Sequence, residues 1–274
     1  MHRAATASLS VYKTMENQRM VVTVKNGTDE FSGAQVVVVG GHLGSGPSIV
    51  RGFVERGARV VVGVLAGVLA GAGSAEPAPI EGATNVPLDF GNPQAIKTFF
   101  DICEKSLGGL SIVVMMAPPV KTGAALSIAD DEYRAIINME LIGPILCIKE
   151  AARRLVAHGY GRIISFVSMS GKAGVHKHVA PFAAAKGGLI TFSRVLAAEL
   201  APSGVTVNVI ATSLFDVQVA KKTPAELAEM VKGIPVGRVG LSDEAAHSAL
   251  FLASRQSGYI TGETLSMSGG RFMD

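Results

Sequence analysis

The sequence predicts a single α/β domain whose doubly wound parallel sheet carries helices on both faces. Three observations predict it. From Phe31 onward, apolar runs rich in valine and isoleucine alternate with helical patterns. These runs are nearly continuous, as in parallel strands that are buried on both faces. The chain has 274 residues, 48% hydrophobic and 17% charged, which is enough for one large core and short for two domains.

The predicted strands and helices follow one another along the chain. The apolar runs predict strands at residues 34–39, 59–64, 110–115, 162–167, 205–210 and 264–267. Between them, apolar residues at helical spacing predict helices at residues 47–56, 93–104, 130–158, 181–201, 223–232 and 243–253. Pro47 and Gly57 delimit the first helix, and Thr223 with Glu226 has the pattern of a capping box. In such sheets, ligands bind beyond the carboxyl ends of the strands.

Composition sets the limits of the predicted domain. Residues 31–274 carry the α/β pattern, whereas residues 1–30 hold basic residues and hydroxyls without the apolar core of a signal peptide. We expect this N-terminal extension to be a flexible arm or to add a short strand at residues 20–25, with a targeting segment as the alternative. Residues 66–79 predict a mobile loop. The charge-free stretch at residues 60–75 falls short of the ~18 apolar residues that a membrane span needs.

Charge and cysteine content exclude several classes of partner. Lys and Arg number 25 against 22 Asp and Glu, a net charge of +3, and the basic residues are scattered, so we expect neither a nucleic-acid nor a membrane partner. Cys103 and Cys147 lie in separate helical patterns without the spacing of metal ligands. We expect reduced core thiols, no metal site and a cytoplasmic protein.

A glycine-rich loop follows the first predicted strand and opens the first predicted helix. Its sequence runs Gly40-Gly-His-Leu-Gly44-Ser-Gly46. Glycines allow a sharp turn and a close approach to a pyrophosphate, whose charge the helix N-terminus stabilises. The alternative is a tight turn that serves packing alone. The strand–turn–helix context favours nucleotide binding.

Several further segments join this loop in resembling the short-chain dehydrogenase/reductase family, from Phe31 to the C-terminus. They are Gly40, Gly44 and Gly46 of the loop, Asp89, Gly161–Ser168, Phe182-Ala-Ala-Ala-Lys186, the segment 201–208 and the segments 259–262 and 268–270. The resemblance implies a Rossmann-like fold, a homo-oligomer (dimer or tetramer), an adenine contact from Asp89 and an NADP or NAD cofactor held in part by Lys186.

The resemblance fails at the residue that moves a proton in this family. There, a tyrosine four residues before the lysine protonates the substrate carbonyl, a serine holds the substrate oxygen, and the lysine lowers the tyrosine pKa. This chain keeps Ser168 and Lys186, but Phe182 stands in place of the tyrosine, an FxxxK motif in place of YxxxK. A phenyl ring transfers no proton, and general acid–base help is worth ~10²–10⁴ in rate.

Other positions also depart from the family pattern. They are Val39, Val64, the Met115–Pro118 segment, Glu140, Thr212, Ser213 and Val217. These changes remove contacts to the ribose, the nicotinamide and the substrate. His42 is the candidate nearest the position where a 2′-phosphate would bind, with an uninvolved surface histidine as the alternative. The sequence does not choose between NADP and NAD.

Three side chains offer other acid–base chemistry. Glu140 falls at a family asparagine position that faces Lys186, where it is either half of a structural ion pair or a general base. A lysine partner is expected to depress the carboxyl pKa. His176 and His178 lie in the loop before Phe182 and could replace the missing acid, with an exposed basic loop as the alternative.

Apolar residues at strand ends predict a substrate pocket beneath a helical lid at residues 223–232. Its lining residues are Met115, Met116, Met169, Phe182, Leu214 and Phe215.

Three functions compete. The first is a repurposed enzyme that acts on an apolar carbonyl compound by isomerisation, elimination or cyclisation, with Ser168, Lys186 and Glu140 as catalytic residues, His176 or His178 assisting, and no cofactor required. The second is an NADP(H)-dependent reductase of the dienoyl or enoyl kind, whose family members also lack this tyrosine. The third is a non-catalytic partner subunit that packs through the helices at residues 130–158 and 181–201. Fold analogy alone does not choose among them.

Overall fold

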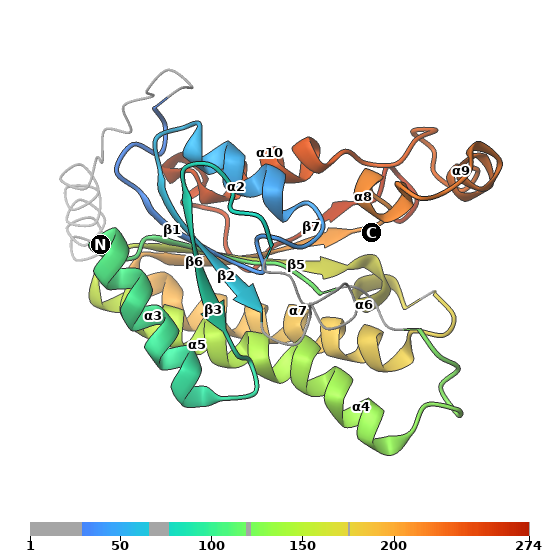
Figure 1. The fold of residues 1–274 in the computed structure, drawn as a ribbon, viewed down its shortest axis with the longest axis horizontal. Coiled ribbons are helices and arrows are strands. Elements are labelled where there is room, and N and C mark those ends of the chain that lie inside the picture. Colours follow the sequence, from blue (N-terminus) through green and yellow to red (C-terminus); the bar gives the residue numbers. More distant parts are fainter. Residues whose placement is uncertain (1–28, 66–76, 119–121, 175, 274) are drawn as a thin grey trace, which may run out of the picture.

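The computed structural model describes residues 29–65, 77–118, 122–174 and 176–273. The extension at residues 1–28, with its expected strand at 20–25, and most of the loop at 66–79 lie outside the described residues. The described chain forms one seven-stranded sheet in the order β3-β2-β1-β4-β5-β6-β7, covered by helices on both faces (Figure 1). The predicted fold class is confirmed.

Every strand of the sheet pairs in parallel with its neighbours. The strands are β1 (Gln35–Val39), β2 (Arg59–Leu65), β3 (Ala83–Leu88), β4 (Ile112–Met115), β5 (Gly161–Ser168), β6 (Val205–Thr212) and β7 (Thr264–Met267). All the predicted strands form. The sequence analysis missed β3, whose pattern is broken by Pro87 and has only Val86 and Leu88 buried. A proline is tolerated there because β3 is an edge strand.

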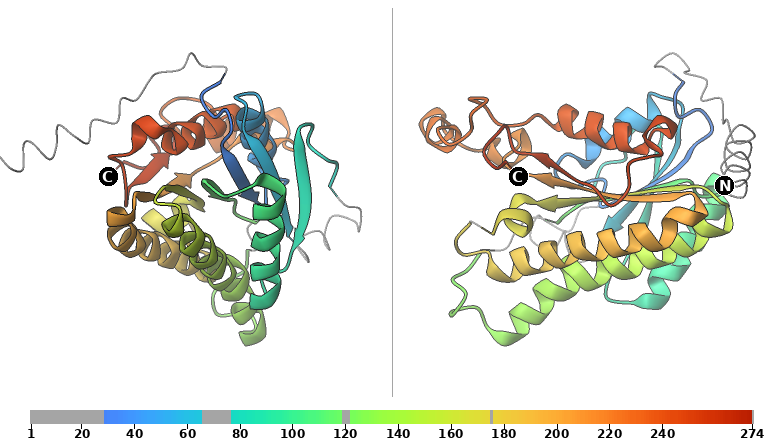
Figure 2. Two further views of the ribbon diagram at one scale, coloured as in Figure 1. Left: turned by 90° about the vertical axis from the view of Figure 1, so that its left-hand side faces the viewer. Right: turned by 180° about the vertical axis from the view of Figure 1, so that it is seen from behind.

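Two hydrophobic cores flank the sheet. On one face, α2 (Gly46–Val54) and α10 (Ser242–Ala253) pack together over the sheet. On the other, α3 (Pro93–Leu107), α5 (Gly143–Ala157) and α7 (Ala180–Leu200) form a second layer (Figure 2). Cys103 and Cys147 are free and fully buried in this second core. Both are therefore core thiols, as the sequence predicts. Burial raises the pKa of the Cys103 thiol to about 12.

The helix predicted at residues 130–158 is interrupted. It consists of α4 (Asp130–Ile137), a π-helical turn η2 (Asn138–Ile142) and α5. Pro144 supplies no N–H for a regular helical bond, which favours a wide turn just before it. Gly143 packs so closely on Phe90 that an added Cβ would lie 2.6 Å from the Phe90 Cβ. Together these residues fix the place of the turn, and the turn buries Glu140.

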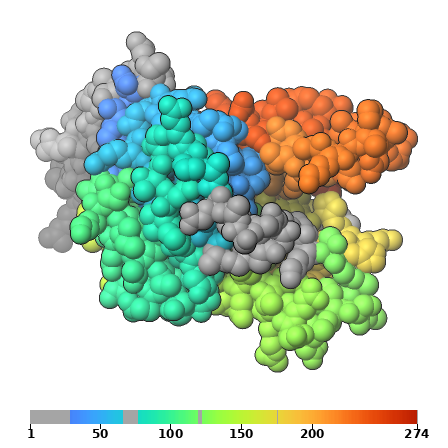
Figure 3. Space-filling model, viewed as in Figure 1, coloured from blue at the N-terminus to red at the C-terminus, as the bar shows by residue number. Residues whose placement is uncertain are grey.

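Short helices extend past the carboxyl end of the sheet. They are α6 (Met169–Ala173), α8 (Asp216–Val219) and α9 (Pro224–Val231), while the 3-10 turns η3 (Ala201–Ser203) and η4 (Arg255–Ser257) lie at the opposite end. The capping box of α9 forms, since Thr223 and Glu226 exchange hydrogen bonds. The expected lid over a pocket does not form. Helix α9 has no buried residue and projects from the body as an arm (Figure 3).

The described residues lack two kinds of feature. No described helix is long and apolar enough to cross a membrane. The described part of the chain also holds no group of three or more His, Cys, Asp or Glu side chains arranged to bind a metal ion.

Candidate active site

The glycine loop between β1 and α2 is built as the sequence predicts. Gly40 and Gly44 have φ of 72° and 51°, in the left-handed region that L side chains rarely adopt. A Cβ on Gly46 would lie 2.5 Å from the carbonyl oxygen of Gly41. The backbone is therefore compact, and α2 begins directly behind the loop.

Free donors gather in this loop. Among the described residues, the backbone N–H groups of His42, Gly44 and Ser45 have no hydrogen-bond acceptor. Both ring nitrogens of His42 are buried and also lack a partner within the described chain, and burial lowers the pKa of this imidazole. Unsatisfied donors at a helix N-terminus form an anion site. The free donors of the loop would suit the pyrophosphate of a dinucleotide, and the unpartnered His42 ring lies in the same loop.

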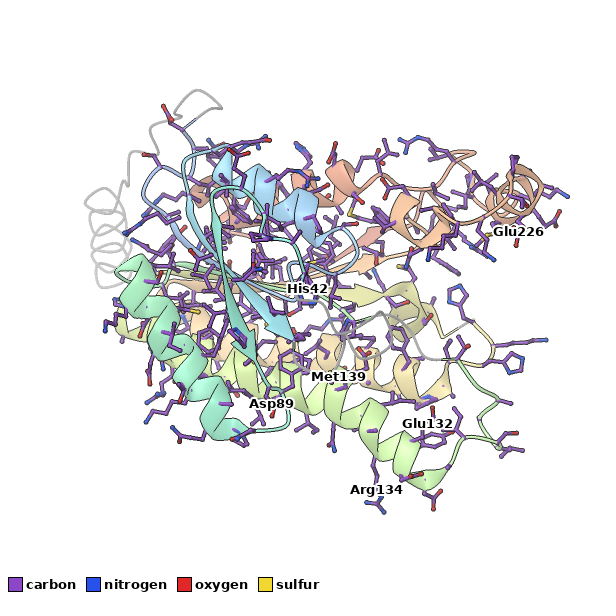
Figure 4. The ribbon with its side chains drawn as sticks, in the orientation of Figure 1. His42, Asp89, Glu132, Arg134, Met139 and Glu226 are labelled. Carbon is purple, nitrogen blue, oxygen red and sulfur yellow. The ribbon has the colours of Figure 1, made fainter. Side chains whose placement is uncertain are left out.

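Asp89 lies directly after β3, at the same edge of the sheet as the loop (Figure 4). It is exposed, and its Oδ1 accepts a hydrogen bond from the Gly91 N–H at 2.8 Å. This turn holds the carboxylate beyond the strand end, a place compatible with the adenine contact that the resemblance implies.

Ser168 ends β5 and caps α6, and it begins a chain of polar contacts. Its hydroxyl lies 3.1 Å from the Ser170 hydroxyl, which lies 2.7 Å from Nδ1 of His176. Ser170 is buried and His176 half-buried. Burial, followed by the charge of Arg271, lowers the pKa of His176. The imidazole ring also packs edge-on against Phe272, with centroids 5.7 Å apart. The structure thus connects Ser168 with His176 through Ser170.

Lys186 and Glu140 form a buried ion pair. Lys186 Nζ lies 2.7 Å from Glu140 Oε2, and the side chains are 1% and 6% exposed. The expected contact is present, but the expected depression of the Glu140 pKa is wrong. Burial raises this pKa and outweighs the opposing effect of Lys186. This geometry matches the structural reading of the pair.

His178 does not join this group. It is exposed, and its backbone has a φ of 62°. Its carbonyl accepts a hydrogen bond from Gly123, and within the described chain its side chain has no hydrogen-bond partner. His178 is therefore best described as an exposed loop residue, the alternative given in the sequence analysis.

The residues predicted to line an apolar pocket are distributed over different parts of the core. Met115 and Met169 are buried in the core beneath α5 and α7, and Met116 and Phe215 in the core beneath α2 and α10. Phe182 forms a small cluster with Ile136 and Val179. Leu214 is half-buried, and its carbonyl accepts from the Gly240 N–H. A position at the end of a strand does not by itself distinguish a pocket residue from a core residue.

No described tyrosine replaces the missing one. Tyr133 donates its hydroxyl to the Ala125 carbonyl at 2.8 Å. Tyr160 lies between the guanidinium groups of Arg162 and Arg255 at the amino end of the sheet, and Tyr259 is fully exposed. Tyr12, the fourth tyrosine of the chain, lies outside the described residues.

The sequence analysis missed Ser170 and Arg271. The repeated serine in Ser168-Met-Ser170, with a histidine six residues further on, was a signal for the first. Arg271 gave no such signal, because it reaches His176 only through the folded C-terminal segment. Lys172 was missed as well, and its ammonium donates to the Ser266 hydroxyl at 2.8 Å and the Thr264 carbonyl at 3.2 Å.

The chain is similar to several known proteins. Residues 41–271 match a family model described as enoyl-(acyl carrier protein) reductase. The chain is 32% identical to the 3-oxoacyl-[acyl-carrier-protein] reductase FabG of Salmonella typhimurium, over 89% of this chain and 99% of that one. It is 29% identical to the 2-dehydro-3-deoxy-L-rhamnonate dehydrogenase (NAD(+)) of a Sphingomonas species, over 88% and 96% of the two chains. A crystal structure of a short-chain type dehydrogenase/reductase from Mycobacterium marinum has a TM-score of 0.79 at 28% identity, covering 90% and 98%.

Proposed function

The chain belongs to the short-chain dehydrogenase/reductase family, and on that premise we propose that it is an NAD(P)(H)-dependent oxidoreductase that reduces a carbonyl group on an acyl substrate. The observation that carries the proposal is the glycine loop, whose free N–H groups and unpartnered His42 ring suit a pyrophosphate. The reductase and dehydrogenase relatives support the redox chemistry. The non-redox enzyme that the missing tyrosine first favoured has no such support. Its base, Glu140, is buried and held by Lys186.

The proton in this proposal comes from His176. The nicotinamide, when bound, supplies a hydride to the substrate carbon. Ser168 donates its hydroxyl proton to the substrate oxygen, Ser170 reprotonates Ser168, and the His176 imidazolium reprotonates Ser170. A hydroxyl both donates and accepts, so the contacts of 3.1 and 2.7 Å can carry a proton in this direction. The carbonyl gains one hydride and one proton and becomes an alcohol.

Lys186 has a supporting place in the proposal. Its ammonium is 1% exposed and bound to Glu140, so it serves to hold α7 against the π-turn rather than to donate protons. A cation at this point also favours negative charge on groups nearby. The Lys186 ammonium has three N–H donors, so its contact with Glu140 leaves donors for the cofactor ribose that the resemblance implies it binds.

One observation favours a second candidate, reduction of an enoyl or dienoyl thioester. Phe182 takes the place of the family tyrosine and is 1% exposed, as expected if the usual phenol is not needed. The family model's description also names an enoyl substrate. The two candidates share the cofactor and differ in the bond that is reduced.

Two titrations and two assays test the proposal. Purified protein is titrated with NADPH and with NADH while the nucleotide fluorescence is followed. A 3-oxoacyl thioester and a trans-2-enoyl thioester are then each offered with the nucleotide that binds. We expect nucleotide oxidation with the 3-oxoacyl substrate and a hydroxyacyl product by mass spectrometry. Turnover of the enoyl thioester alone would establish the second candidate, and binding of neither nucleotide would overturn both.

The proposal places the enzyme in the cytoplasm as a homo-oligomer. Ile142, Val156 and Val195 are exposed apolar residues on η2, α5 and α7, the helices through which a partner subunit was expected to pack. Light scattering of the purified protein tests the oligomer.

A further inference from the structure

A second cavity lies at the opposite end of the sheet from the glycine loop. It has a volume of about 770 Å³ and is bounded by the amino-terminal ends of β1, β4, β5 and β6 and by the segment that follows α10. This end lies opposite the arm formed by α8 and α9 (Figure 1). A volume in this range suits a small organic ligand. Nothing in the proposed reaction uses this end of the molecule.

Arg162 is the buried cation of this cavity. It is 4% exposed and stands second in β5, in register with Ile112 and Thr206 on the neighbouring strands. Its Nε donates to the Ser254 carbonyl at 3.3 Å and its Nη1 to the Gly161 carbonyl at 2.9 Å. A guanidinium has five N–H donors, and among the described residues Nη2 has no acceptor. Most of the donor capacity of Arg162 is therefore unused.

Arg255 adds a second positive charge. The guanidinium groups of Arg162 and Arg255 lie 4.6 and 4.4 Å from the centroid of the Tyr160 ring. Within the described chain, neither forms an ion pair with a carboxylate. The acidic residue of the lining, Glu30, is exposed. Thr206 also lines the cavity, and its hydroxyl is buried without a hydrogen-bond partner among the described residues.

The structure leaves this charge partly unbalanced. The Ser254 and Gly161 carbonyls that accept from Arg162 carry only partial negative charge. A buried cation without a counter-ion is costly. Burial lowers the pKa of Arg162, Tyr160 opposes this effect, and the neighbouring Arg255 adds a smaller lowering. Two cations, an unpartnered hydroxyl and an open volume are together the features of a site for anionic oxygen atoms.

We propose that this cavity binds a small organic anion, a carboxylate or a phosphate monoester, through Arg162 Nη2, Arg255 and the Thr206 hydroxyl. The site is separate from the dinucleotide site. Arg162 and Ser168 lie near opposite ends of β5, six residues and about 20 Å apart. The proposal does not depend on the redox function, because it rests on residues that the catalytic relay does not use.

Calorimetry with inorganic phosphate and with propionate, at constant ionic strength, tests the site in the full-length protein. We expect one of these probes to bind to the wild type and its Kd to rise about tenfold or more in Arg255→Gln. Arg255 is exposed, so this variant is expected to fold. Arg134→Gln, which removes an exposed arginine of α4, is the matched charge control and should bind as the wild type does.

Phosphate can also enter the glycine loop, so each titration is repeated with saturating NADPH. Binding that persists with NADPH and is lost in Arg255→Gln and Thr206→Val supports the cavity. Binding that NADPH abolishes, or that Arg134→Gln weakens as much as Arg255→Gln does, overturns it. If neither probe binds, the proposal is also overturned, whether or not the protein binds a dinucleotide.

Discussion

The ammonium of Lys186 lies 5.5 Å from the centre of the Phe182 ring, one helical turn away on α7. Both residues are 1% exposed. The spacing that would let a lysine act on a tyrosine is therefore preserved, while the group it would act on has no oxygen. The relation between these two side chains gives the first prediction.

Phe182→Tyr is expected to increase NAD(P)H-dependent carbonyl reduction by about 10²-fold, because it supplies a proton donor beside a cation that lowers its pKa. The rate is measured as kcat with a 3-oxoacyl thioester. Phe192→Tyr, on the same helix, is the matched control and should leave kcat unchanged. A buried hydroxyl without a partner costs about 1–3 kcal/mol, so Tm is measured for both variants. A folded Phe182→Tyr protein with unchanged kcat would contradict the prediction.

His176→Asn is expected to lower kcat by about 10²-fold, the smaller effect typical of a general acid. Ser170→Ala should lower it by a similar factor, and the double variant by no more than either single one, because the two residues act in one relay. His178→Asn is the control, since the His178 side chain is exposed. Independent, multiplicative losses would show that Ser170 and His176 do not share a proton path.

Arg271→Gln is expected to shift the pH dependence of kcat/KM upward. In the relay the protonated imidazole is the donor, so the rate falls as pH rises through the pKa of His176. Burial and Arg271 hold that pKa below the ordinary 6.5, and removing Arg271 removes one of these effects. The pH profile of wild type and variant gives the shift directly. Lys177→Gln, an exposed cation next in sequence, should move the profile less.

Much of the fold could be predicted because burial on both faces leaves a simple pattern in the sequence. β5 and β6 are buried along nearly their whole length, so their apolar runs are easy to recognise in the sequence. β3 was missed because an edge strand needs fewer apolar residues and tolerates Pro87. The π-turn was missed because hydrophobic periodicity does not register one extra residue per turn, although Gly143 and Pro144 mark the place.

The candidate site was harder to predict than the fold. The glycine loop follows from backbone geometry, and the Lys186–Glu140 contact was expected from the family resemblance. Met115 and Met116, both predicted to line one pocket, point to opposite faces of the sheet, as neighbours in a strand must. The raised pKa of Glu140 could not be predicted from the sequence either. It depends on whether the effect of burial on this pKa exceeds the opposing effect of the Lys186 ammonium at 2.7 Å.

Gly46→Ala is expected to weaken dinucleotide binding by about tenfold or more, equivalent to about 1.4 kcal/mol. Its Cβ would lie 2.5 Å from the Gly41 carbonyl oxygen, so the loop must shift and misplace its N–H groups. Gly204→Ala is a matched control at the other end of the sheet, since its Cβ would lie 2.6 Å from the Gly159 carbonyl oxygen. Both variants should lose stability, but only Gly46→Ala should raise the Kd for NADPH or NADH. Equal Kd values for Gly46→Ala and Gly204→Ala would show that the glycine loop does not bind the cofactor.

Glu140→Gln is expected to change how stability depends on pH. Burial raises the Glu140 pKa above 4.5, so the folded state favours the protonated carboxyl group. That stabilisation is complete below pH 4.5 and is lost as pH rises through the folded pKa. Glu226 and Glu244, whose pKa values are lowered to about 2, act in the opposite direction and at lower pH. His42 and His176 affect wild type and variant alike, so the difference between the two proteins isolates Glu140.

Urea unfolding of wild type and variant from pH 4.5 upward measures this difference. Glu140→Gln keeps a neutral side chain beside Lys186, as the protonated carboxyl group does, so its stability relative to the wild type is expected to rise with pH as the wild-type Glu140 ionises. The double variant Glu140→Gln/Lys186→Met removes both charges and shows whether Lys186 contributes to this pH dependence. Both variants should lack the decline in stability that the wild type shows as Glu140 ionises. If the double variant keeps the wild-type decline, Glu140 does not titrate in this range, and burial does not raise its pKa.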